Sequence, residues 1–135
     1  MPTVFEKLNL KAQRRIIVLN APSSFDAELA TLDGVNVVRD AKRAKSIEFA
    51  IAFATTQNQL DLASTVLAEH AIGDAIVWIA YPKSTSKRYS CEFNRDSGWT
   101  VLRNAGFDTV RMVAIDDDWS ALRFRRVEFI KNAKR

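Results

Sequence analysis

Residues 107–129 read FDTVRMVAIDDDWSALRFRRVEF, and this stretch decides how the C-terminal part of the chain folds. It contains two apolar-rich runs, residues 107–115 and 120–129, joined only by the four residues DDDW. Both runs favour strands, because they are rich in β-branched and aromatic side chains. Such a short link cannot cross over a sheet, so the two strands must pair antiparallel. A bulge or a strand end is expected near Arg125 and Arg126, where the alternation of apolar side chains shifts.

Upstream of this hairpin, strand and helix patterns alternate. Strands are predicted over residues 14–21, 35–39, 47–55 and 74–82, and helices over residues 23–34, 56–73 and 94–106, with a helical turn or two within 40–46. Thr56 and Gln59 have the spacing of a capping box, and Gly34, Gly73 and Gly106 stand where the three helices should end. The alternation predicts a three-layer α/β, Rossmann-like domain with a mainly parallel sheet of about six strands. With its antiparallel C-terminal hairpin, this is the methyltransferase-like topology in reduced form.

Length and composition place the chain among soluble globular proteins. We expect residues 1–135 to form a single domain, since the 135 residues are 47% apolar and 27% charged. No apolar run is long enough to span a membrane, and the N-terminus does not have the pattern of a signal peptide. The single cysteine, Cys91, cannot form an internal disulfide. These features predict a cytoplasmic protein without a membrane partner.

The net charge of +4 is concentrated at the C-terminus. Residues 123–135 contain six basic residues and one acid, so they carry +5, and the rest of the chain carries −1. A neutral body argues against a broad basic face, so nucleic acid is not the favoured partner. The basic tail at residues 131–135 is either a solvated end or a contact for a protein or nucleic-acid partner. Homodimerisation through an exposed edge strand is also open.

The patterns that would identify a cofactor or a reaction are missing from the sequence. None of the four glycines lies in the loop after the first strand, where dinucleotide, P-loop and S-adenosylmethionine sites have them. The one histidine, His70, cannot form a triad or a multi-histidine metal site, and Cys91 has no nearby base. The three aspartates of DDDW are best interpreted as a turn. The sequence therefore predicts no cofactor, no metal and no catalytic residue, and it leaves open whether the protein is an enzyme.

Two proline-led loops offer the best candidate site. NAPSSF (20–25) follows the first strand and YPKSTSK (81–87) follows the fourth, and in a Rossmann-like strand order these two loops should face each other. Their hydroxyls and lysines suit a small anion or a phosphorylated metabolite, although Ser23 is alternatively only a helix cap. Asp40 stands about 20 residues after the first strand, as a ribose-binding acid does, or it caps a short helical turn. Trp119 is either a lid or a core residue. The predicted ligand-binding residues are Ser23, Ser24, Asp40, Lys83, Ser84, Trp119 and Arg123, the last two at the edge of the cleft.

The segments IVWIAYPK (76–83) and WSALRF (119–124) carry a family resemblance. They resemble an uncharacterised bacterial family of short Rossmann-like domains of unknown function, number 3052 in that series. The resemblance implies no activity, only a shared feature that includes Pro82, Lys83, Trp119, Ser120 and Arg123. Together with the loops, it favours a non-catalytic module that binds a small anion or a partner. A degenerate methyltransferase that depends on S-adenosylmethionine is the alternative, because of the C-terminal hairpin.

Overall fold

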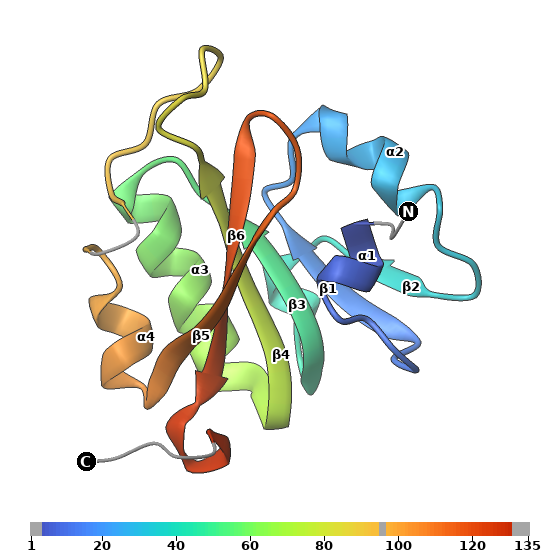
Figure 1. Ribbon diagram of the computed structural model, residues 1–135. Coiled ribbons are helices and arrows are strands. Elements are labelled where there is room, and N and C mark those ends of the chain that lie inside the picture. Colours follow the sequence, from blue (N-terminus) through green and yellow to red (C-terminus); the bar gives the residue numbers. More distant parts are fainter. Residues whose placement is uncertain (1–3, 95–96, 131–135) are drawn as a thin grey trace.

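A six-stranded sheet organises the molecule (Figure 1). The computed structural model describes residues 4–94 and 97–130, so the basic tail at residues 131–135 lies outside the described residues. The strands have the order β2-β1-β3-β4-β6-β5 and comprise β1 (Arg15–Leu19), β2 (Asn36–Val38), β3 (Ile47–Phe53), β4 (Ala71–Pro82), β5 (Phe107–Ala114) and β6 (Trp119–Arg126). The first four strands pair parallel, and β6 is antiparallel to both β4 and β5. The predicted parallel sheet and antiparallel hairpin are confirmed, as is the strand end at Arg126.

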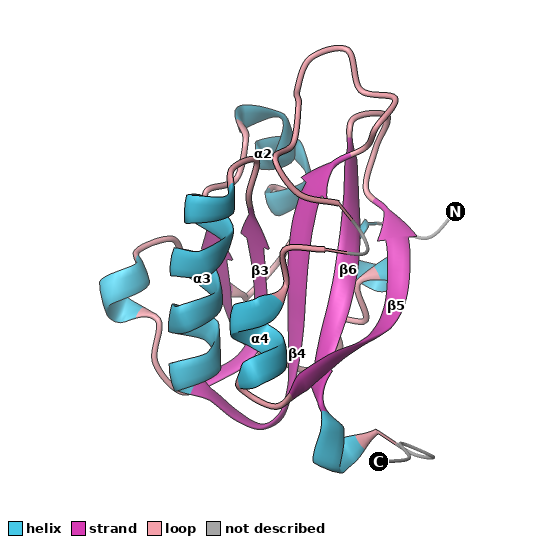
Figure 2. Ribbon diagram, turned by 90° about the vertical axis from the view of Figure 1, so that its left-hand side faces the viewer, coloured by secondary structure: helices cyan, strands magenta, loops and turns pink. Residues whose placement is uncertain are grey.

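Helices cover both faces of the sheet and make three layers (Figures 1 and 2). Helices α3 (Gln57–His70) and α4 (Thr100–Asn104) lie on one face, which we call the α3 face. The short helices α1 (Val4–Lys7) and α2 (Asp26–Leu29) lie on the other, the α1 face. Three single 3₁₀ turns, at Ser23–Phe25, Ala41–Arg43 and Val127–Phe129, complete the secondary structure of the described residues. No helix among those residues is both long and apolar enough to cross a membrane.

The side chains of β3 show how this layering arises. Ala50 and Ala52, together with Ala54 just after the strand, point to the α3 face, where their small size lets α3 lie close to the sheet. Phe49 and Phe53 point to the α1 face, where bulky side chains fill the space left by short helices. Both sets are almost fully buried, which is typical of a central parallel strand.

The helix boundaries differ from the predictions at three places. The helix predicted over 23–34 is a 3₁₀ turn followed by the four residues of α2, because only Phe25 of this segment is fully buried and little packing holds further turns. The predicted capping box of Thr56 and Gln59 is confirmed, but α3 ends at His70 and Gly73 lies inside β4. The helix predicted over 94–106 is limited to α4.

The strand order places the loops differently from the expectation. The chain adds β2 on one side of β1 and β3 on the other side, so the strand order reverses between the parallel neighbours β1 and β3. Strand β4 lies one strand further out. The loop after β1 therefore faces the loop after β3, and the prediction that it faces the loop after β4 is wrong. In an open α/β sheet this reversal is where ligands bind, beyond the carboxyl ends of the strands.

Candidate functional site

Two adjoining cavities open at the carboxyl ends of β1 and β3. The first, here called the Asp40 cavity, has a volume of about 330 Å³ and is lined by Leu19, Asn20, Arg39, Asp40, Ala41, Gln59, Leu62, Ala63 and Val66. The second, the Trp119 cavity, has a volume of about 290 Å³ and is lined by Asn20, Pro22, Ser23, Phe53, Ala54, Thr55, Gln59, Tyr89 and Trp119. Asn20 and Gln59 belong to both walls, so the two cavities are neighbours along one edge of the sheet.

Gln59 is held at this junction by the start of α3. Its side-chain oxygen accepts hydrogen bonds from the backbone N–H groups of Thr55 (2.9 Å) and Thr56 (3.3 Å). Asn20 has a φ of +59°, a left-handed conformation that non-glycine residues adopt rarely and asparagine most readily. The loop after β1 therefore turns as a glycine loop would, but it retains side chains where the glycine-rich loops of phosphate and cofactor sites have none.

Asp40 caps the 3₁₀ turn that follows β2. Its Oδ1 accepts a hydrogen bond from the backbone N–H of Lys42 at 2.9 Å, which confirms the capping interpretation. The carboxylate is nevertheless exposed and lines the Asp40 cavity. Arg39 beside it forms an exposed ion pair with Asp26 at 3.1 Å. The cavity thus combines one acid at its rim with an apolar wall from α3.

Trp119 lies at the start of β6 and is only 3% exposed, so its side chain belongs to the core as well as to a cavity wall. Its ring packs against Phe53 (centroids 5.2 Å apart) and Tyr89 (4.9 Å). The indole Nε1 is buried and has no hydrogen-bond partner among the described residues. A buried donor without a partner is uncommon in a folded protein, and it points to an acceptor that a ligand or water would supply.

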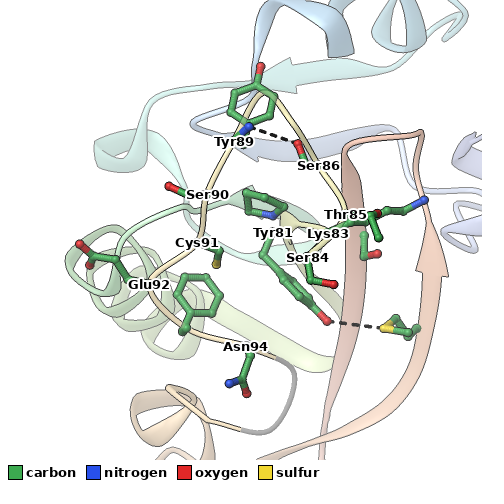
Figure 3. Close-up of a pocket in the computed structure, with 14 residues that line it drawn as sticks. Tyr81, Lys83, Ser84, Thr85, Ser86, Tyr89, Ser90, Cys91, Glu92 and Asn94 are labelled. Atoms are coloured by element: carbon green, nitrogen blue, oxygen red, sulfur yellow. Dashed lines mark hydrogen bonds between the residues drawn. The ribbon is translucent and has the colours of Figure 1, made fainter.

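A third cavity lies beyond β4, beneath the loop that contains residues 83–94 (Figure 3). We call it the Tyr81 cavity; its volume is about 780 Å³, and Lys83 and Ser84 belong to its wall. Figure 3 shows Tyr81 and Ser84 on the inner side of the loop, and the Tyr81 hydroxyl donates to Sδ of Met112 at 3.5 Å. Cys91 points inward, and burial raises the pKa of its thiol, which makes it a poor nucleophile.

The DDDW turn is held by its own hydrogen bonds and contacts this loop. Asp116 Oδ1 accepts hydrogen bonds from the backbone N–H groups of Asp118 (2.8 Å) and Trp119 (2.9 Å), which is a side-chain turn. Asp118 in turn accepts a hydrogen bond from the Ser86 hydroxyl at 2.9 Å. Within residues 4–94 and 97–130 no group of three or more potential metal ligands gathers.

The predicted site residues are therefore not one cluster. Ser23 lines the Trp119 cavity, whereas Lys83 and Ser84 line the Tyr81 cavity, so the predicted cleft between the two loops is not formed. Tyr89 lines both cavities and lies between them. Ser24 is exposed and lines none of the three cavities.

Arg123 is not at the edge of the cleft either. It lies in the middle of β6, paired in register with Trp78 of β4, and it lines none of the three cavities. Sequence reasoning missed Asn20, Gln59 and Tyr89 as wall residues. The signal for Gln59 was present, because the capping box that the sequence predicts also places its side chain beside the loop after β3.

Comparison with known proteins defines the fold. No protein-family model matches the sequence, and no curated protein sequence does. Solved structures do match: a SAM dependent methyltransferase from Aquifex aeolicus has a TM-score of 0.62 at 12% identity, over 91% of this chain and 87% of that one. The N-methyltransferase NodS from Bradyrhizobium japonicum has a TM-score of 0.55 at 11% identity, over 90% and 91%. The cyclase SpnF has a TM-score of 0.59 at 11% identity, over 91% and 78%, so different activities occur on this architecture. This protein has the Rossmann-like methyltransferase fold in a reduced form.

Proposed function

We propose that this protein binds a nucleoside-containing ligand, with S-adenosylmethionine as the first candidate, in the joined Asp40 and Trp119 cavities. The observation that carries the proposal is the position of these cavities, at the carboxyl ends of β1 and β3 where the strand order reverses. Two of the similar structures are methyltransferases, which supports a ligand of this class.

The Asp40 cavity suits the nucleoside part of such a ligand. The exposed carboxylate of Asp40 can accept hydrogen bonds from ribose hydroxyls while it continues to cap the turn, since a carboxylate has several acceptor positions. Leu62, Ala63 and Val66 of α3 offer an apolar wall for the base. Leu62 is 62% exposed, so a bound base would cover apolar surface that now faces solvent.

The Trp119 cavity would hold the part of the ligand beyond the nucleoside. It suits that part less well than a site with a glycine-rich loop would. Ala21 and Pro22 keep the backbone of the loop after β1 further from a ligand than glycines would. The N–H of Trp119 offers a hydrogen bond to an anionic or carbonyl oxygen. S-adenosylmethionine, when bound, supplies an activated methyl group. The contribution of this chain is to orient the ligand and to exclude water with Phe53 and Tyr89.

Isothermal titration calorimetry with S-adenosylmethionine, S-adenosylhomocysteine and adenosine tests the proposal. The informative variant is Asp40→Asn, because asparagine retains an oxygen that can cap the turn but loses the charge that strengthens a bond to a hydroxyl. We expect its affinity to fall about tenfold or more. Asp117→Asn, an exposed acid outside the three cavities, is the matched control. If no ligand produces heat, or if Asp40→Asn binds as the wild type does, the proposal is wrong.

A further inference from the structure

Three arginines gather on the α1 face of the sheet, away from the cavities described above. Arg123 and Arg125 of β6 alternate with Leu122 and Phe124, which point to the α3 face. Arg111 of β5 lies directly opposite Arg123 in the antiparallel register. Arg123 is four residues from Trp119 along the extended strand, which corresponds to roughly 13 Å.

The positive charge of this cluster is only partly neutralised. Asp74 binds Arg125 with both carboxylate oxygens, at 2.8 Å to Nε and 2.6 Å to Nη2, so this acid is already committed to one arginine. Among the described residues, the side chains of Arg111 and Arg123 form no hydrogen bond and no ion pair. Like charges directly opposite each other destabilise a sheet, so this arrangement has a cost in the protein without a bound anion.

Arg123 is the most constrained of the three. Its Nε is buried and has no hydrogen-bond partner among the described residues, although the guanidinium presents donors in a planar fork. Burial lowers the pKa of Arg123, and the neighbouring charges of Arg125 and Arg111 lower it further, while the charge of Asp74 acts in the opposite direction. A buried donor inside a cluster whose positive charge is only partly neutralised lacks an anionic acceptor.

We infer that Arg111 and Arg123 form a clamp for a phosphoryl group on the α1 face of the sheet. Two free guanidinium groups balance the two negative charges of a phosphate dianion, and each fork matches two phosphate oxygens. The group comes either from a small phosphorylated molecule or from the backbone of a nucleic acid, since both present the same oxygens. This site is separate from the nucleoside cavities and does not depend on the function proposed for them.

Binding of two probes tests the clamp in the full chain. Inorganic phosphate is titrated by calorimetry, and a fluorescent single-stranded oligonucleotide is titrated by anisotropy at low and high salt. The variants are Arg111→Met, Arg123→Met and Arg123→Lys, with Arg43→Met, an exposed arginine on a 3₁₀ turn, as the matched control. Arg111 is exposed, so its substitution tests the clamp even if a change at Arg123 disturbs folding.

We expect at least one probe to bind, and both methionine variants to weaken it about tenfold or more while Arg43→Met leaves it unchanged. Arg123→Lys should not restore the affinity, because lysine carries the charge without the fork. Binding of phosphate itself would identify a small ligand, and salt-dependent binding of the oligonucleotide alone would identify a nucleic-acid backbone. If neither probe binds, or if Arg111→Met and Arg43→Met behave alike, the inference is overturned. Asp40→Asn should leave the affinity for phosphate unchanged, so the two proposals fail independently.

Discussion

Replacing Arg123 with methionine is expected to stabilise the protein, although the change removes a charged residue from the middle of a strand. The side chain of Arg123 is partly buried, its Nε has no partner among the described residues, and Arg111 lies directly opposite. Methionine offers a flexible apolar stem of similar length, so it retains most of the contacts that the methylene groups of the arginine make.

The size of the effect follows from two costs that the substitution removes. A buried polar group without a partner costs about 1–3 kcal/mol. The like charge opposite it adds roughly 0.2–1 kcal/mol. Because Arg123 is only partly buried, we take the low end of these ranges and expect the free energy of unfolding to rise by about 1 kcal/mol. For a domain of 135 residues, this corresponds to a melting temperature about 4 °C higher.

Urea unfolding and thermal melting followed by circular dichroism measure the effect, with Arg43→Met as the control that should stay within about 0.5 kcal/mol of the wild type. Added salt should stabilise the wild type more than Arg123→Met, because salt screens the repulsion between the arginines. A loss of stability in Arg123→Met, with the control unchanged, would refute the reasoning, since it would mean that favourable contacts hold the arginine in place.

Three further substitutions test other parts of the fold. Gly98→Ala should lower the free energy of unfolding in urea by about 2–3 kcal/mol, because the new Cβ would lie 2.7 Å from a side-chain carbon. The matched change Gly73→Ala meets nothing within 4 Å and should cost about 1 kcal/mol, so equal losses in the two variants would contradict the clash. Thr56→Ala should lose about 1 kcal/mol with the capping box, and an unchanged urea midpoint would argue against the cap. The hydrogen bond and the charge of Arg125 lower the pKa of Asp74 in the folded protein. The pair therefore stabilises the fold at pH values above the ordinary carboxyl pKa, and this stabilisation is lost as the pH falls through the lowered pKa of the folded state. The stability difference between the wild type and Asp74→Asn, about 1 kcal/mol or less for such an exposed pair, should therefore vanish in acid, and a difference that persists there would contradict this assignment.

Local signals in the sequence predicted the local structure well. The capping box of Thr56 and Gln59 and the cap formed by Asp40 were both predictable, because each depends on residues two or three positions apart. The length of α2 was not predictable, since the periodicity of residues 23–34 suits a longer helix that tertiary packing does not support. The walls of the cavities were predictable only in part, because Asn20, Gln59 and Tyr89 come from three separate segments.

The sequence by itself determined which segments are strands and that the last two pair antiparallel, since the four residues of DDDW cannot cross the sheet. Only the tertiary structure decided the order of the parallel strands. Strands such as β3 and β4 are apolar on both faces, so their patterns are alike and do not specify their neighbours. That order brings the loop after β1 beside the loop after β3, and it separates Ser23 from Lys83. The register of the β5–β6 hairpin, in turn, places Arg123 opposite Arg111, and neither residue lines a cavity described above.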